Sequence, residues 1–260
     1  MTDPRFPITF VGAGPGDPEL ITVKGRRALE EADRVIYAGS LVPEAVLSWC
    51  REGVPTANSA GMDLDAIVEA MASGYRAGER VVRLHTGDPS LYGAIHEQMA
   101  ALRDREIPYR VIPGVTAAFA AAAAMGIEYT RPEVTQTLIL TRAAGRTPVP
   151  EAEALADLAR HRAAMAIYLS IGQVADVARA LADAYGPEAP CAVAYRVSQP
   201  DEQIIPTRIA DLAETVAAAG ITRQALILVG PSVGPPDTGD GPRSKLYDRS
   251  FSHGFRSDER

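Results

Sequence analysis

The sequence has little of what builds disulfide frameworks or metal centres. Two cysteines occur in 260 residues, Cys50 and Cys191, and they stand far apart in the chain. The four histidines show no metal-ligand spacing. We therefore expect no protein-bound metal. The scarcity of cysteine also fits a reducing, cytoplasmic compartment.

Long apolar runs are missing as well. The most apolar stretch, AAFAAAAAM at 117–125, is shorter than the roughly 20 residues that span a bilayer. The N-terminal residues MTDPRFPITF do not have the basic start and apolar core of a signal peptide. The sequence therefore predicts a globular protein of the cytoplasm without a membrane partner.

The chain also lacks an excess of basic residues. Its 26 Lys and Arg face 33 Asp and Glu, which gives a formal net charge of −7. This balance argues against nucleic acid as the main partner, because phosphate binding needs a concentrated basic face. An acidic small molecule remains compatible with this charge, provided that arginines cluster locally around it.

What is present is an alternation of short apolar runs with longer segments of helical pattern. In the first half it predicts an α/β fold with a mostly parallel sheet covered by helices. The expected strands are 7–14, 33–39, 80–90, 108–116, 135–142, 165–170, 191–197, 202–207 and 224–230. The expected helices are 20–32, 62–78, 91–106, 116–126, 151–160, 172–185 and 209–219. We expect an N-terminal α/β domain over 1–115, a C-terminal α/β domain over 116–235 and a flexible tail over 236–260.

The opening strand runs into a glycine-rich turn, VGAGPGDPEL at 11–20. A dinucleotide-binding turn needs Gly-x-Gly-x-x-Gly leading directly into a helix, with an acidic residue at the end of the next strand. Here Pro15 removes a backbone donor within the turn, and Asp17 would face a pyrophosphate with the wrong sign. We therefore disfavour a nicotinamide cofactor. A tight connection and a rigid wall for another ligand both remain open.

Two further turns favour the ligand wall. LHTGDPSLYG at 84–93 repeats the Gly-Asp-Pro triplet of residues 16–18, and IPGVTAA at 112–118 adds another glycine turn. Each follows a predicted strand. Ligands of open α/β sheets bind at the carboxyl ends of the strands.

Together, VGAGPGDPELIT, GDPSLYG, PGVTA, AIYL and ALILVG resemble the tetrapyrrole methylases, over about residues 6–231. These are S-adenosylmethionine-dependent enzymes of cobalamin and sirohaem synthesis. YAGSLV (37–42), QTLILTRAAGRTPVPE (136–151) and SFSHGFR (250–256) look like the branch that methylates C11 of precorrin-4. The resemblance implies two α/β domains with a trough between them, a homodimer, and S-adenosylmethionine as methyl donor. It also implies that precorrin-4, or its cobalt form, is converted to precorrin-5.

Three other functions stay open beside this one. The enzyme alternative is methylation of another carbon on the corrin path. The non-enzymatic alternative is a module that binds a tetrapyrrole or S-adenosylmethionine without turnover. A nucleotide-dependent oxidoreductase is what the glycine motif alone would suggest.

The resemblance also implies which residues meet the cofactor. For three of them a structural role competes: Asp88 as the cap of a helix starting near Leu91, Thr116 as the cap of the next helix, and Leu169 as a buried strand residue. Ala194 and Tyr195 lie on a strand expected to present backbone groups to the adenine. The cofactor set is Gly87, Asp88, Pro89, Tyr92, Thr116, Ala117, Leu169, Ala194 and Tyr195.

The acceptor is then a tetrapyrrole polycarboxylate, which needs arginines within an acidic protein. Arg142 and Arg146 flank the glycine of TRAAGRTP, and Pro15 and Gly16 belong to the opening turn. Asp17 is a candidate catalytic residue that would orient a pyrrole N–H or a proton. The remaining candidates are Arg83, Arg131 and Arg196 near strand ends, and His85, which precedes the cofactor loop and is otherwise a satisfied strand-end histidine.

Overall fold

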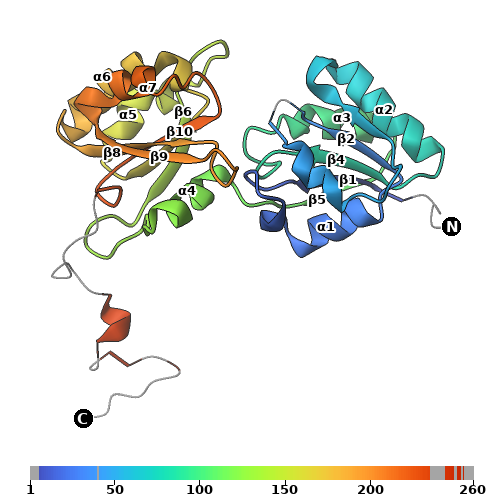
Figure 1. The fold of residues 1–260 in the computed structure, drawn as a ribbon, viewed down its shortest axis with the longest axis horizontal. Helices are drawn as coiled ribbons and strands as arrows, with labels where there is room; N and C mark the ends of the chain where they lie inside the picture. Colours follow the sequence, from blue (N-terminus) through green and yellow to red (C-terminus); the bar gives the residue numbers. More distant parts are fainter. Residues whose placement is uncertain (1–5, 40, 235–243, 249–250, 253, 255–260) are drawn as a thin grey trace. The chain divides into compact units, whose positions relative to one another are not determined.

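The computed structural model describes residues 6–39, 41–234, 244–248, 251–252 and 254 (Figure 1). They form two compact units. The first holds the chain up to Ala124 together with Arg196–Glu202, and the second holds Met125–Tyr195 and the chain from Gln203 onward. Most of the 236–260 tail lies outside the described residues. No helix within the described part of the chain is long and apolar enough to cross a membrane.

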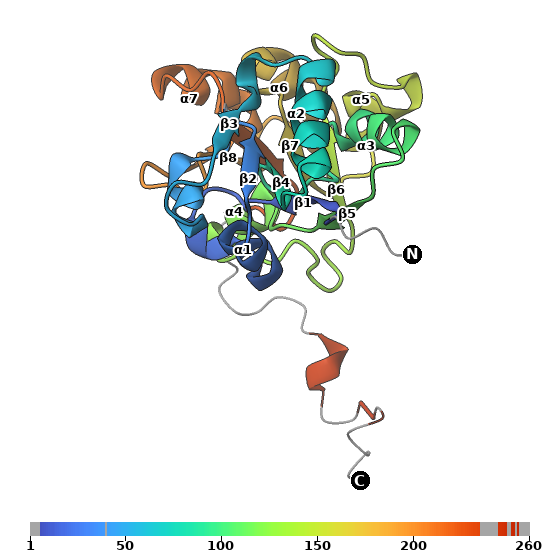
Figure 2. The ribbon, with the colours of Figure 1, turned by 90° about the vertical axis from the view of Figure 1, so that its right-hand side faces the viewer.

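The first unit is a parallel sheet with helices on both faces, as the alternation of its first half predicts. The strand order is β3-β2-β4-β1-β5, and every pair is parallel. Helix α1 covers one face, and α2 and α3 cover the other (Figures 1 and 2). The strands are β1 Ile8–Gly12, β2 Arg34–Tyr37, β3 Thr56–Asn58, β4 Val81–His85 and β5 Tyr109–Ile112. The helices are α1 Val23–Glu30, α2 Leu64–Arg76 and α3 Ile95–Asp104.

Both faces of this sheet are apolar, because successive strand residues point to opposite sides. Phe10 packs with Met71 and Leu102 in the core under α2 and α3. Val11, the next residue, packs with Leu29 in the core under α1. The inner strands β1, β2 and β4 are buried on both sides, which is why most of their residues are apolar.

The second unit has a mixed sheet in the order β6-β7-β10-β8-β9. Only β6 and β7 pair in parallel. Residues 196–202 join β8 to β9 without a helix, and strands joined by such a short connection pair antiparallel. The strands are β6 Leu138–Arg142, β7 Ala164–Tyr168, β8 Pro190–Tyr195, β9 Gln203–Arg208 and β10 Ala225–Val229. The helices after the first unit's sheet are α4 Ala117–Met125, α5 Leu155–Ala159, α6 Val174–Tyr185 and α7 Leu212–Ala218.

The carboxyl ends of β1, β4 and β5 meet through glycine backbones. A Cβ on Gly114 would lie 2.1 Å from the carbonyl oxygen of Gly87, and one on Gly12 would lie 2.6 Å from Cα of Gly114. The N–H of Gly87 donates to the carbonyl of Gly14 over 2.8 Å, and Gly14 donates back over 3.3 Å. Three turns therefore pack backbone against backbone, which only glycine allows at this distance.

A buried polar cluster lies just below these turns, on the α2 and α3 side of β4. Arg83 is 4% exposed, and it donates from Nε to Oε1 of Gln98 over 3.1 Å and from Nη1 to the carbonyl of Ile36 over 3.3 Å. His85 is 3% exposed and stacks on Phe10 with ring centroids 5.9 Å apart. Its Nε2 has no partner within the described residues. The expectation that His85 is a strand-end histidine with its hydrogen bonds satisfied is therefore wrong.

Burial sets the charge of this cluster. It lowers the pKa of Arg83 to about 10, and together with the nearby Arg83 charge it lowers the pKa of His85 to about 3. His85 is therefore neutral near pH 7, and Arg83 is the charged group of the cluster.

We predict that Gly114→Ala destabilises the protein by about 3 kcal/mol or more, because its methyl group would collide with backbone atoms that cannot move independently. Gly61→Ala is the matched control, since nothing lies within 4 Å of its Cβ position. It should change the free energy of unfolding by less than about 0.5 kcal/mol. Urea unfolding followed by circular dichroism measures both, and wild-type stability in Gly114→Ala would contradict the close backbone packing.

His85 gives a pH prediction. The unfolded chain binds a proton at this residue near pH 6.5 and the folded chain only near pH 3. Its contribution to stability is therefore complete above pH 6.5 and is lost as the pH falls toward 3. When the pH falls from 7 to 5, the free energy of unfolding of the wild type should decrease by about 2 kcal/mol more than that of His85→Gln. Urea unfolding at each pH measures this, and an equal loss of unfolding free energy in His85→Gln and the wild type would refute the buried neutral ring.

Candidate functional site

Asp88 ties the β4 turn to the β5 turn. Its Oδ1 accepts the N–H of Ser90 over 2.8 Å and also the Ser90 hydroxyl, and its Oδ2 accepts the N–H of Gly114 over 2.9 Å. Burial raises the pKa of Asp88, but these hydrogen bonds together outweigh it and hold the pKa below its usual value. Asp88 is therefore a carboxylate at neutral pH that fixes two strand-end turns against each other.

The alternative role of Asp88, capping a helix near Leu91, is wrong. Helix α3 begins only at Ile95, and the residue before it, Ala94, has φ 48° and makes no side-chain cap. Tyr92 also has a positive φ, 57°, and leaves 43% of its surface exposed. The segment between the Gly-Asp-Pro triplet and α3 is thus a tight irregular loop with an exposed aromatic ring.

The opening turn does not have the geometry of a dinucleotide site. Pro15 and Gly16 are buried. Asp17 then caps a short 3₁₀ helix, Pro18–Leu20, through a 2.8 Å hydrogen bond from the N–H of Glu19 to its Oδ1. Helix α1 starts later, and its N-terminus is capped by Thr22, which accepts the N–H of Gly25. No glycine of the turn therefore opens onto a free helix N-terminus.

Two distant segments fix this turn. The N–H of Asp17 donates to Oγ of Ser198 over 3.0 Å. The indole N–H of Trp49 donates to the carbonyl of Pro18 over 3.0 Å, while Arg26 lies 3.9 Å over the centre of its ring. Sequence reasoning missed Ser198 and Trp49, because no local pattern links them to the turn.

The β5 turn leads into α4. Thr116 is buried, and its carbonyl accepts the N–H groups of Phe119 and Ala120, which starts the helix at Ala117. The Thr116 carbonyl therefore makes the first hydrogen bonds of α4. The two predicted cofactor residues, Thr116 and Ala117, stand two and three positions after Gly114.

The predicted cofactor residues of the second unit stand at two strand ends. Leu169 directly follows β7, has φ 54° and is 66% exposed. The alternative that it is a buried strand residue is therefore wrong. Ala194 is buried in β8 between Leu226 of β10 and Ile204 of β9. Tyr195 ends the strand and is half-buried.

The two predicted substrate arginines differ in their surroundings. Arg142 ends β6, and its guanidinium donates to the carbonyls of Ala143, Thr147 and Pro148, so it shapes its own loop. Arg146, on the same loop, is exposed and makes no hydrogen bond or ion pair with the described residues. Arg146 is therefore the one of the two whose charge is available to a carboxylate.

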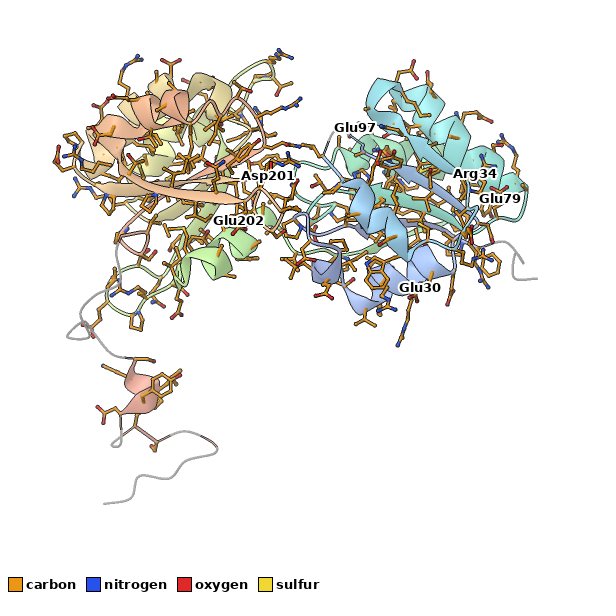
Figure 3. All side chains as sticks on the ribbon, in the orientation of Figure 1. Glu30, Arg34, Glu79, Glu97, Asp201 and Glu202 are labelled. Atoms are coloured by element: carbon orange, nitrogen blue, oxygen red, sulfur yellow. The ribbon has the colours of Figure 1, made fainter. Side chains whose placement is uncertain are left out.

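The other arginine candidates also have partners. Arg196 forms an ion pair with Asp201 over 2.9 Å, within the 196–202 loop where Figure 3 labels Asp201 and Glu202. Arg131 is half-buried and makes contacts within the protein. Arg34 and Glu79 form a bidentate pair at the opposite, amino-terminal edge of the first sheet (Figure 3). Ion pairs of the first unit therefore lie both near the strand-end turns and at the opposite edge of its sheet.

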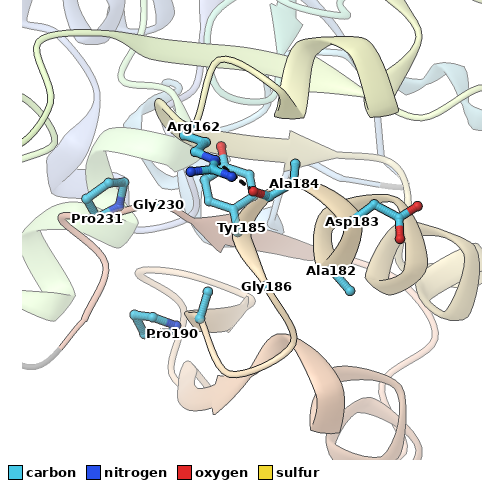
Figure 4. A pocket seen from close by; sticks show the side chains of 10 residues that line it. Arg162, Ala182, Asp183, Ala184, Tyr185, Gly186, Pro190, Gly230 and Pro231 are labelled. Carbon is cyan, nitrogen blue, oxygen red and sulfur yellow. Dashed lines mark hydrogen bonds between the residues drawn. The ribbon is translucent and has the colours of Figure 1, made fainter.

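A separate cavity of about 400 Å³ lies in the second unit, at the C-terminal end of α6 (Figure 4). Arg162 donates to the carbonyl of Ala184 over 2.9 Å at its wall, and the Tyr185 hydroxyl donates to the carbonyl of Ala163 over 2.7 Å. None of the predicted site residues lines it. The Arg162 guanidinium and the Tyr185 hydroxyl at this cavity thus both donate to backbone carbonyls of the second unit.

Comparison with known proteins gives the family. The model for tetrapyrrole (corrin/porphyrin) methylases matches residues 7–213. A cobalt-precorrin-4 C(11)-methyltransferase of Methanocaldococcus jannaschii is 48% identical and covers 96% of this chain and 95% of the relative. A precorrin-4 C(11)-methyltransferase of Pseudomonas aeruginosa is 48% identical and covers 97% of this chain and 99% of the relative.

Solved structures agree. A cobalt precorrin-4 methyltransferase, described as a cobalamin biosynthetic enzyme, superposes with a TM-score of 0.85 at 45% identity, covering 88% of this chain and 96% of that one. The uroporphyrin-III C-methyltransferase of Thermus thermophilus, in complex with S-adenosylhomocysteine, gives 0.71 at 27% identity, covering 86% and 92%. The chain belongs to the tetrapyrrole methylases.

Proposed function

We propose that this protein transfers a methyl group from S-adenosylmethionine to C11 of precorrin-4, or of its cobalt form, and so makes precorrin-5 for cobalamin biosynthesis. The observation that carries the proposal is the joined set of glycine turns held by Asp88, in a chain 48% identical over nearly its whole length to relatives of that name. Those two relatives carry the cobalt and the metal-free name, so both substrate forms enter the test.

The β4 turn fits a cofactor that approaches the backbone closely. Gly87 has φ 58°, and a Cβ there would meet nothing nearer than Cα of Thr116 at 3.8 Å. The turn thus presents bare backbone, flanked by the Asp88 carboxylate and the exposed ring of Tyr92. We assign cofactor contact to these turns and, in the second unit, to the strand ends at Leu169 and Tyr195.

S-adenosylmethionine supplies an electrophilic methyl group on a sulfonium. The acceptor carbon of a reduced tetrapyrrole is enamine-like and already nucleophilic, so the protein needs no strong base. Its task is to hold the reacting atoms in line and to exclude water, and positioning of this kind supplies roughly 7–11 kcal/mol of the barrier. Fixed turns serve that task better than mobile ones.

For the acceptor we assign Pro15 and Gly16 to the wall of its site, and Arg146 to one of its carboxylates. Arg142 holds the Arg146 loop in shape through its three carbonyl contacts. Asp17 uses Oδ1 to cap its own turn, while its Oδ2 makes no hydrogen bond within the described residues. We assign that oxygen to a pyrrole N–H or to the proton released after methylation.

We also propose a homodimer in the cytoplasm. Large apolar side chains stay exposed at Val23, Val111 and Phe119, which supports a further protein surface covering part of the first unit. Light scattering coupled to size-exclusion chromatography measures the mass of the assembly directly.

The first test of the function is calorimetric titration with S-adenosylhomocysteine and then with NAD⁺. We expect heat from the first ligand alone, and Asp88→Ala should weaken its affinity at least about tenfold, because the β4 and β5 turns lose their carboxylate link. Asp104→Ala is the control, since Asp104 ends α3 and is exposed. Binding of NAD⁺ without S-adenosylhomocysteine would contradict the proposal.

Incubation with labelled S-adenosylmethionine and each precorrin-4 form then identifies the reaction. Carbon NMR should place the new methyl group at C11. A label on another ring carbon would mean a different step of the corrin path, and binding without any methyl transfer would indicate a non-catalytic module.

A further inference from the structure

The 196–202 loop between β8 and β9 lies against the opening turn. Besides the bond from the N–H of Asp17 to Ser198, the side chain of Gln199 lies directly on Gly16. A Cβ at Gly16 would come within 2.4 Å of Cγ of Gln199 and within 3.2 Å of its Nε2. The absence of a side chain at Gly16 is therefore what lets Gln199 reach the backbone of the turn.

Arg196 fixes the orientation of the Gln199 amide. Its Nε and Nη2 donate to the same Oε1 over 3.0 and 2.8 Å. A guanidinium has donors only, so the atom that it meets must be the amide oxygen. Nη1 of Arg196 is in turn held by Asp201 over 2.9 Å. The amide is thus locked with its NH₂ group turned away from the fork.

That NH₂ group is left as a positioned donor. Gln199 is half-buried, and within the described residues its Nε2 makes no hydrogen bond. The loop around it is itself constrained, since Arg196 and Ser198 have φ 45° and 63° and the N–H of Ser198 donates to Glu202. Two hydrogen bonds from Arg196 therefore hold the Gln199 side chain so that its free donor stands beside Gly16.

We propose that Gln199 is a substrate-binding residue that donates from Nε2 to a carboxylate oxygen of the tetrapyrrole. The proposal rests on the proposed function, which makes the acceptor a polycarboxylate and the opening turn part of its site. A neutral amide suits this place, because Arg196 already supplies the charge that orients it while Asp201 neutralises that charge. The donor then recognises a carboxylate by direction more than by charge.

The cofactor carries a carboxylate too, and Gly14 of the opening turn is bridged to Gly87 of the proposed cofactor turn. The cofactor carboxylate is therefore the other candidate partner of the Gln199 amide. Gln199 lies on Gly16, and within the described residues its side-chain hydrogen bonds run to Arg196 and not to the Gly87–Asp88 backbone, so we assign it to the substrate. Separate measurements for the two ligands distinguish them.

Gln199→Glu is the decisive variant. A carboxylate can still accept both N–H groups of Arg196, so the loop keeps its support, but the donor becomes a negatively charged acceptor. We expect KM for precorrin-4 to rise at least about tenfold with kcat little changed, and the dissociation constant of S-adenosylhomocysteine to stay within about twofold. Gln199→Met removes the donor without adding charge and should raise KM by a smaller factor.

Gln203→Glu is the matched control, because it makes the same charge change at an exposed position four residues further along the same hairpin. It should leave KM unchanged, and a thermal melt checks that every variant is folded. Unchanged KM in folded Gln199→Glu would overturn the proposal, as would weaker S-adenosylhomocysteine binding with unchanged KM, which would move the contact to the cofactor. Failure of the wild type to methylate precorrin-4 would instead overturn the proposed function itself.

Discussion

The approach of three glycine backbones at the carboxyl ends of β1, β4 and β5 is the constraint on which this site depends. A methyl group on Gly12 or on Gly114 would collide with backbone atoms of the other turns, including the carbonyl oxygen of Gly87. Because the turns lie so close, the side chain of Asp88 can reach across to the N–H of Gly114. A larger separation would leave that carboxylate without one of its partners and the turns free to move independently.

The buried polar groups beneath these turns follow from the same packing. Two positions at the end of β4 face helices α2 and α3. They carry Arg83 and His85, where neighbouring strands carry apolar residues. Burial keeps the imidazole neutral, and Gln98 on α3 accepts from the guanidinium. The strand end is thereby coupled to the helix that follows its turn, so the position of the Gly-Asp-Pro loop depends on both.

Much of the fold could be predicted from the sequence, because β1, β7 and β10 are largely apolar runs and the long helices are amphipathic. Strand β3 and the 3₁₀ helix Glu44–Trp49 were missed, since elements this short carry no periodicity. The same limit applies to the site. Glycine and Asp-Pro turns are visible locally, whereas the contact between Asp17 and Ser198 joins residues 181 positions apart. The exposed, left-handed Leu169 could not be foreseen either, because a leucine after an apolar strand usually continues the core.

The opening turn is held by three segments that are remote from one another in the chain: the β4 turn through Gly87, the first-unit 3₁₀ helix through Trp49, and the 196–202 loop through Ser198. None of these contacts supplies a base, an acid or a metal. Each fixes a backbone group whose position would otherwise cost ordering free energy when a ligand arrives. A methyl transfer between an activated donor and a nucleophilic carbon depends mainly on alignment. The hydrogen bonds of this chain are arranged accordingly, because they stabilise the shape of the wall rather than create a reactive group within it.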